Sequence, residues 1–235
     1  MNHDKSALPA KDEKMGAVKA MFDSIAVDYE KINSYMTFGM DSGWRKKLLD
    51  HLGAKPGNIV LDVGCGTGDL IRELQKKGMH AIGIDLSFNM IKQNRSLGNI
   101  GQGIAEELPF KDDSFDGLVS GFSLRNFVNL KTFFKECYRV VKPGGRIALL
   151  DVSEPQLPIV KEIHGLWFKR CVPKIGALFS DKNAYSYLPA STVYLPNREV
   201  LLEMLERQGF LGSSHKTLFF GTVQILDATV PVFKY

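Results

Sequence analysis

Apolar and polar residues are arranged along the central part of the chain in blocks that predict strands and helices in alternation. Short apolar runs typical of buried strands stand at 59–63, 80–85, 100–104, 115–120 and 146–152. Helical spacing of apolar residues follows most of them, through Leu70 and Leu74, from 87 to 95, and from about 130 to 141. Strands separated by helices predict a parallel sheet with helices on both faces.

The two ends of the chain extend this pattern. Residues 1–13 are polar and predict a flexible tail ahead of one folded domain, 14–235. Amphipathic helices are expected from Lys14 to about Ile32, from Ser42 to His51 and from Asn197 to Gln208, with strand-like runs at 215–220 and 222–228. Residues of about 155–196 are irregular, apolar and aromatic, and we expect them to form a cap insertion after the fifth strand.

Composition and charge narrow the class of protein. The chain is 44% hydrophobic and 24% charged, which is sufficient for a packed core. Its net charge is only +4 and the two signs are interspersed, so we expect no nucleic-acid partner. Three scattered cysteines and unpaired histidines predict no metal site. Without a secretory leader or a run of about eighteen apolar residues, a cytoplasmic location is expected.

A glycine-rich turn between the first strand and its helix is the strongest indication of a ligand site. Gly64, Gly66 and Gly68 permit positive φ and let a ligand approach the backbone, whose amides we expect to face it. Asp85 ends the next strand, where a carboxylate can accept hydrogen bonds from ribose hydroxyls. The alternatives are a simple tight turn and, for Asp85, a charge at a helix N-terminus. The pattern predicts a ribonucleoside ligand.

The spacing of the turn favours S-adenosylmethionine over a nicotinamide dinucleotide. The turn has the form Gly-x-Gly-x-Gly, whereas the dinucleotide fingerprint has Gly-x-Gly-x-x-Gly. Asp62 precedes the turn and can receive an amino group, which an amino-acid moiety has and a pyrophosphate lacks. The alternative for Asp62 is a carboxylate that only orients the turn.

Several segments resemble those of known methyltransferases. Residues 61–70, 105–110 with 114–116, and 139–146 resemble the motifs of class I S-adenosylmethionine-dependent methyltransferases. Narrower segments resemble the ubiquinone/menaquinone biosynthesis C-methyltransferase family, collinearly from about Met15 to the C-terminus: 22–26, 29–33, 36–39, 44–45, 121–126, 173–176, 184–191 and 220–221. The resemblance implies an α/β fold with a doubly wound, mostly parallel, seven-stranded Rossmann-like sheet, N-terminal helices and the cap.

The resemblance also implies a cofactor site for S-adenosylmethionine, which leaves as S-adenosylhomocysteine. The cofactor-binding positions that it implies are Asp62, Gly64, Cys65, Gly66, Thr67, Asp85, Leu86, Met90, Ile104, Ala105, Glu106 and Gly121. Ile104 departs from the family, which often has Asp or Asn there. Its side chain cannot accept from the adenine amino group, so backbone at Ile104 and Ala105, or Glu106, has to read the base.

The chemistry implied is methylation of a ring carbon of a polyprenylated quinol. Such a quinol must lose a phenolic proton, so the site needs a group that stabilises the phenolate. Arg125 and Asn126, after the fourth strand, are the candidates, with Tyr29 closing over the cofactor or acceptor. A structural Arg125 paired with a carboxylate and a packed Tyr29 are the alternatives.

Several questions of acceptor and partner stay open at this point. An O- or N-methyltransferase acting on another small aromatic or lipid-like metabolite, and a non-catalytic nucleoside-binding subunit of a quinone-biosynthesis assembly, are the alternative functions. The apolar cap with Lys161, Lys169, Arg170 and Lys174 predicts at most a weak peripheral contact with the inner membrane face. A packed cap, a homodimer and a biosynthetic complex are equally open.

Overall fold

The computed structural model describes residues 13–166, 187 and 190–234. The strands are β1 (Ile59–Val63), β2 (His80–Asp85), β3 (Asn99–Gln102), β4 (Phe115–Gly121), β5 (Val141–Val152), β6 (Leu211–Leu218) and β7 (Val223–Thr229). The helices are α1 (Lys14–Ile25), α2 (Tyr29–Thr37), α3 (Asp41–Leu52), α4 (Asp69–Lys76), α5 (Phe88–Lys92), α6 (Leu130–Val140), α7 (Pro158–Leu166) and α10 (Arg198–Arg207). Short 3-10 turns are η2 (Leu124–Asn126), η4 (Ser191–Tyr194) and η5 (Phe219–Gly221).

In the described residues the strands form one seven-stranded sheet in the order β3-β2-β1-β4-β5-β7-β6. Strands β1 to β5 pair in parallel, whereas β7 pairs antiparallel with both β5 and β6. The order reverses direction at β1, so a crevice opens beyond the carboxyl ends of β1 and β4. The predicted doubly wound, mostly parallel sheet is confirmed.

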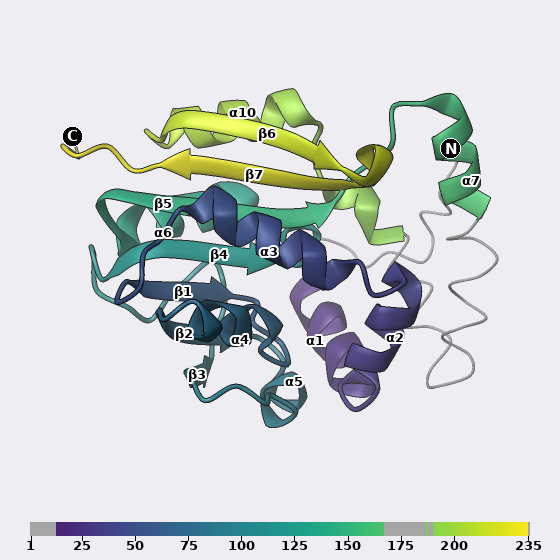
Figure 1. Cartoon of the computed structure of the whole chain (residues 1–235), viewed down its shortest axis with the longest axis horizontal. Coiled ribbons are helices and arrows are strands. Elements are labelled where there is room, and N and C mark those ends of the chain that lie inside the picture. Colours follow the sequence, from purple (N-terminus) through teal and green to yellow (C-terminus); the bar gives the residue numbers. More distant parts are fainter. Residues whose placement is uncertain (1–12, 167–186, 188–189, 235) are drawn as a thin grey trace.

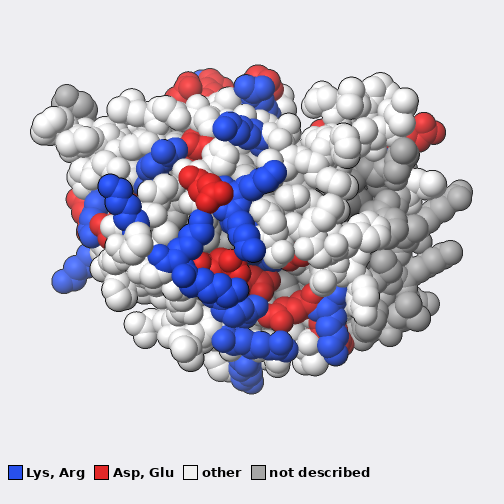
Figure 2. Space-filling model, viewed as in Figure 1, with Lys and Arg blue, Asp and Glu red and all other residues white. Residues whose placement is uncertain are grey.

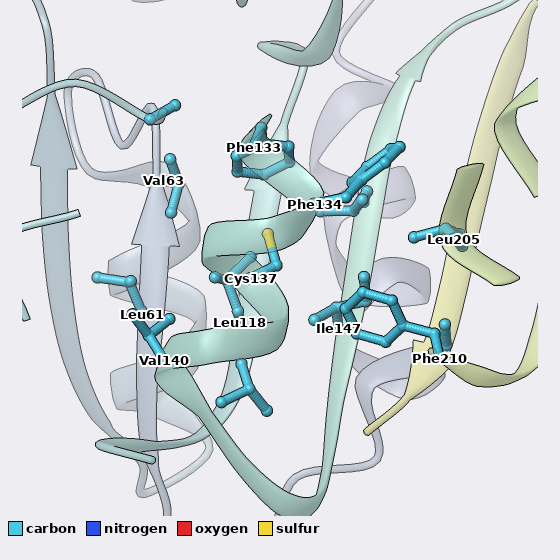
Figure 3. Packing of buried hydrophobic residues seen from close by; sticks show 14 of the residues in the cluster. Leu61, Val63, Leu118, Phe133, Phe134, Cys137, Val140, Ile147, Leu205 and Phe210 are labelled. Carbon is cyan, nitrogen blue, oxygen red and sulfur yellow. The ribbon is translucent and has the colours of Figure 1, made fainter. Parts of the chain in front are cut away.

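Helices cover both faces of the sheet and bury two apolar layers. Helices α6 and α10 pack on one face around Phe133, Phe134 and Leu205, which are inaccessible to solvent. Figure 3 shows these side chains converging with Leu118 and Ile147 of the sheet. Helices α3 and α4 cover the other face and bury its second layer. With both faces covered, only the strand ends are open to a ligand.

Helices α1 and α2 lie at the end of the sheet toward which the arrowheads of β1 and β4 point (Figure 1). The single helix predicted from Lys14 to Ile32 is wrong, because a turn at 26–28 separates α1 from α2. The apolar spacing continues through the turn because both helices bury Ile25 and Ile32 in one small cluster. A hydrophobic pattern alone therefore cannot locate this break.

Other predicted boundaries also shift. The weak strand expected at 100–104 is β3 at 99–102, and the helix expected at 87–95 is the short α5. The strand predicted at 215–220 begins at Leu211 and stops at Leu218, because Phe219 and Phe220 have positive φ and leave the ladder. The cap was expected to be irregular, but it contains α7 and η4. The predicted tail and residues 167–186 of the cap lie outside the described residues.

Charged side chains on the face that carries α3 and α4 are of mixed sign (Figure 2). Lys77 lies 2.8 Å from Asp50 and Lys76 lies 2.7 Å from Glu73. The absence of a nucleic-acid partner stays a prediction. Among the helices the structure describes, none combines the length and the apolar character needed to cross a bilayer.

Candidate active site

The glycine turn joins β1 to α4 in a conformation that requires glycine. Gly64, Gly66 and Gly68 have φ of 75°, 50° and 87°, a region that side chains disfavour. Space is restricted as well, because a Cβ on Gly64 would lie 2.4 Å from Ser123 Oγ and one on Gly68 would lie 2.4 Å from Asn94 Oδ1. The turn is therefore compact, and loops from β4 and α5 press against it.

The backbone amides of this turn mostly bond within the protein, which corrects our expectation that they face the ligand. The Gly64 and Cys65 amides donate to Ile84 O at 2.8 and 3.0 Å. The Gly66 amide donates to Asp85 Oδ2 at 2.8 Å, and the Gly68 amide donates to Cys65 O at 2.9 Å. The glycines thus let a ligand approach the backbone closely and fix the shape of the turn, but they leave few amide donors for that ligand.

Asp85 fastens the turn to the start of α5. Its second oxygen, Oδ1, accepts from the Ser87 amide at 2.8 Å. Burial raises the pKa of Asp85, while the bonds from the Ser87 and Gly66 amides oppose that rise. The helix-N-terminal role that we held as the alternative is therefore present, and the same carboxylate also lines the cavity.

Asp62 is a buried carboxylate without a partner in the described part of the chain. The residue is 1% exposed, and neither oxygen has a hydrogen-bond partner there. Burial, followed by the charge of Asp85, raises its pKa from 3.8 to about 8, and Arg45 only partly opposes this. A buried carboxylate is stable only when it is paired or protonated. Asp62 therefore indicates a missing cation or donor in the cavity that it lines.

A cavity of about 890 Å³, its open mouth included, lies between this turn and α1. All twelve predicted cofactor-binding residues line it: Asp62, Gly64, Cys65, Gly66, Thr67, Asp85, Leu86, Met90, Ile104, Ala105, Glu106 and Gly121. The structure brings the predicted cofactor residues together, while their role in binding stays a prediction.

Cys65 contributes a small apolar wall. Its thiol is 6% exposed, and burial raises its pKa well above the usual range. A neutral buried thiol is a poor nucleophile. Gly83 on β2 makes room for it, because a Cβ there would lie 2.8 Å from Cys65 Sγ.

The end of the cavity expected to hold adenine is formed by backbone more than by polar side chains. Ile104 forms an isolated bridge with Glu107, and Ala105 is buried. Glu106 Oε1 accepts from the amides of Val128 and Asn129 at 2.6 and 3.1 Å, so one oxygen of the predicted substitute acceptor is already engaged.

Helix α1 closes the cavity through Met15, Val18 and Phe22. Asp23 anchors it across α5, where its carboxylate accepts from Ser87 Oγ at 2.6 Å and from the Asn89 amide at 3.1 Å. The sequence predicts this wall only as an amphipathic helix. It does not show whether the apolar side chains of that helix face a cavity or the protein core.

Tyr29 and Arg45 form the adjoining wall. Burial raises the pKa of Tyr29 to about 12, so its phenol is neutral near pH 7. Arg45 is 7% exposed, forms an ion pair with Asp41, and reaches Asp69 Oδ2 at 2.9 Å. The sequence alone gives Arg45 no role, although it lies in the family-like segment 44–45 and four residues after Asp41 on one helix.

The structure places Asn126 in the cavity wall and Arg125 behind it. The Arg125 guanidinium pairs with the buried Asp151, donates to Phe122 O at 2.8 Å and to Ser191 Oγ at 3.2 Å. This pairing is the structural alternative that we considered for Arg125. Asn126 Oδ1 accepts from the Tyr187 hydroxyl at 3.3 Å, which leaves its amide group for the cavity.

The site fits S-adenosylmethionine in its chemistry. Asp62 offers an unpaired carboxylate for the ammonium of the methionine part, and Asp85 stands where ribose hydroxyls are held in such sheets. In the described residues no cluster of metal-ligating side chains occurs. The sheet order, the turn and the two carboxylates define a class I S-adenosylmethionine-dependent methyltransferase.

Comparisons with known proteins give the family. Residues 8–229 match the ubiE/COQ5 methyltransferase family, and the chain belongs to it. It is 37% identical over 233 residues to the demethylmenaquinone methyltransferase of Desulfitobacterium hafniense, which covers 93% of this chain and 92% of that protein. It is 34% identical over 225 residues to the ubiquinone/menaquinone biosynthesis C-methyltransferase of Geotalea daltonii, covering 91% of this chain and 96% of the relative.

Solved structures support the fold. An S-adenosylmethionine-dependent methyltransferase from Thermotoga maritima superposes with a TM-score of 0.65 at 19% identity, over 90% of this chain and 99% of that one. Phosphoethanolamine N-methyltransferase 2 of Haemonchus contortus, in complex with S-adenosylmethionine, gives a TM-score of 0.60 at 18% identity, over 80% of this chain and 52% of that one. The expected Rossmann-like methyltransferase fold is confirmed.

Proposed function

We propose that this chain transfers the methyl group of S-adenosylmethionine to a ring carbon of a polyprenylated quinol, of the demethylmenaquinol or ubiquinone-precursor type. The names of the Desulfitobacterium and Geotalea relatives support the acceptor class. The observation that carries the cofactor part is the unpaired carboxylate of Asp62 in the cavity wall. A cationic amino group beside it removes the cost of burying that charge.

The bound sulfonium supplies an already activated methyl group, so the protein contributes position and dryness. Asp62 receives the amino group, Asp85 receives the ribose hydroxyls, and the apolar side chains of α1 exclude water. Ile104 and Ala105 edge the adenine through their backbone. The glycine turn keeps its shape through its own hydrogen bonds, so it is ready before the ligand arrives.

The acceptor ring is expected on the side of the cavity formed by Tyr29, Phe122 and Asn126. The Asn126 amide donates to the phenolate that forms when the quinol gives its phenolic proton to a water molecule. After methyl transfer, the methylated ring carbon loses its own proton to water, which restores the aromatic ring. Arg125 acts through Asn126, since its charge lies directly behind the cavity and its ion pair with Asp151 fixes η2. Tyr29 keeps its proton near pH 7 and orients the acceptor as a donor.

The test is incubation with S-adenosylmethionine carrying a labelled methyl group and demethylmenaquinol, with analysis of the product. A new ring C–CH₃ group supports the proposal. An O-methyl product, or label transferred only to other aromatic metabolites, favours the paralogue with another acceptor. Binding of S-adenosylhomocysteine without any transfer favours the non-catalytic subunit. Calorimetry with S-adenosylhomocysteine and NAD checks the cofactor independently.

The cap is the segment expected to contact a membrane or a partner protein, but it lies largely outside the described residues. Within the described part of the chain, α7 exposes Ile159 and Leu166, and Lys161 lies 2.6 Å from Glu154. A weak contact with the inner membrane face, a homodimer and a biosynthetic complex therefore stay predictions.

A further inference from the structure

Four aromatic side chains form a continuous row from the cavity to the surface. Phe122 lines the cavity, and its ring centroid lies 6.2 Å from that of Trp44 on α3. Trp44 lies 6.0 Å from Phe219, and Phe219 lies 5.5 Å from Phe220 on η5. Exposure increases along the row, since Phe122 is 9% exposed, Phe219 46% and Phe220 69%. We refer to these four residues as the aromatic row.

Three members of the row have a backbone conformation that phenylalanine disfavours. Phe122, Phe219 and Phe220 have φ of 61°, 44° and 56°. A bulky residue at positive φ is an outlier that persists only where the surroundings hold it, and such outliers gather at ligand sites. Three of them in one contact chain indicate a built feature, because glycine or asparagine would adopt these turns at lower cost.

The row leads to a second groove, whose lining combines apolar with polar and charged side chains. Phe220 lines this groove together with Leu157, Val193 and Leu195, beside α7 and η4. Leu157 is 58% exposed, so the outer end of the row is open to a ligand. Two cations lie near its inner end, and both are neutralised: Arg45, 5.9 Å from the Phe122 ring, by Asp41 and Asp69, and Arg125, which donates to Phe122 O, by Asp151. The four rings therefore offer a continuous apolar surface from the cavity to Phe220.

We infer that the aromatic row is the subsite for the isoprenoid tail of the acceptor, with the ring at Phe122 and the tail leaving over Trp44, Phe219 and Phe220. The inference rests on the proposed function for the identity of the acceptor. Planar, branched isoprene units pack well on aromatic faces, and a flexible chain that follows a preformed row loses less entropy than one that orders a new surface. The row accordingly selects acceptors by the presence and length of a tail.

The test compares a naphthoquinol without a tail with the same ring carrying two isoprene units. Phe219→Asn and Phe220→Asn remove the rings while retaining a residue suited to positive φ. We expect each variant to reduce the advantage of the tailed over the tail-free acceptor in kcat/KM by about tenfold, the loss of roughly one buried apolar contact. Turnover of the tail-free acceptor should be unchanged.

Phe233→Asn is the matched control, because Phe233 is 75% exposed and follows the opposite end of β7. It should leave the tail advantage intact. Equal tail advantage in the wild type and both row variants would overturn the inference, as would an equal loss in the control.

A binding readout separates this inference from the proposed function. The chain has two tryptophans, so Trp167→Phe leaves Trp44 as the only one. With S-adenosylhomocysteine bound, Trp44 fluorescence should be quenched at lower concentrations of the tailed naphthoquinone than of the tail-free one, and Phe220→Asn should abolish the difference. If no quinol is methylated but this pattern holds, the proposed function fails and the tail subsite stands. Quenching independent of the tail overturns the subsite.

Discussion

Replacement of Asp62 by asparagine should make the free protein more stable and impair cofactor binding. The buried carboxylate has no hydrogen-bond partner in the described residues, and its pKa is raised from 3.8 to about 8. A carboxyl whose pKa is higher in the folded state destabilises the fold increasingly as pH rises from about 4 to 8. At one pKa unit per about 1.4 kcal/mol, that cost is about 4 kcal/mol at pH 7.

An amide at the same position carries no charge but is itself buried. Its unmade hydrogen bonds cost about 1–3 kcal/mol. We therefore expect Asp62→Asn to raise the free energy of unfolding at pH 7 by about 1–3 kcal/mol. The gain should shrink as pH is lowered and be lost before pH 4, because the cost of the charge there no longer exceeds that of the buried amide. Urea denaturation between pH 4 and 8 measures this difference.

The affinity for the cofactor should depend on pH in the opposite direction to stability: it should rise as pH rises. Because the ammonium of S-adenosylhomocysteine favours the ionised carboxylate, binding should release about one proton at pH 6–7, and the affinity should rise about tenfold per pH unit between 6 and 7.5. Calorimetry in two buffers of different ionisation enthalpy measures the proton release. The Asp62→Asn variant should bind weakly and without this pH dependence.

Asp50→Asn is the control, since the side chain of Asp50 is 69% exposed on α3 and far from the turn in sequence. It should retain wild-type affinity and pH dependence. Wild-type binding with a constant affinity from pH 6 to 7.5, or an Asp62→Asn variant that binds normally, would refute the pairing of Asp62 with an amino group.

Three further predictions follow from the site. Arg125→Ala should abolish transfer with little change in affinity for S-adenosylhomocysteine, and should destabilise the fold by about 3–5 kcal/mol by leaving Asp151 unpaired; wild-type turnover in a transfer assay contradicts this. Gly64→Ala should lower the free energy of unfolding by about 1–3 kcal/mol in a thermal melt, because of its positive φ and the approach to Ser123; an unchanged melting temperature argues against the turn geometry. Tyr29→Phe should reduce kcat without altering the pH–rate profile between pH 7 and 10, because the phenol is neutral there; loss of an alkaline limb in the profile would show that its ionisation matters.

The sequence was sufficient to predict most of the sheet and the set of residues that line the cavity. The apolar runs predicted the five parallel strands near their observed places, because a strand buried on both faces is a short, nearly continuous apolar segment. The run at 222–228 likewise predicted β7. The glycine spacing and Asp62 predicted the position of the cavity, because the carboxyl ends of neighbouring parallel strands lie at the same edge of the sheet.

What the sequence could not give depends on contacts between distant segments. The break between α1 and α2 was missed because both helices bury apolar side chains in the same cluster. The partner of Arg125 is Asp151, 26 residues away in sequence. Only the folded structure shows that the guanidinium points to this carboxylate and not into the cavity. Arg45 was passed over for the same reason, because its second ion pair joins α3 to the start of α4.

The hydrogen bonds that close the glycine turn on Ile84 and Asp85 have a consequence for how quickly the enzyme can exchange product for fresh cofactor. A loop that holds its own shape needs no refolding between turnovers, so we expect the rates of ligand arrival and departure to depend on the opposite wall, helix α1 with its anchor at Asp23. Changes in that anchor should alter the lifetime of the complex, while changes that preserve the turn should not.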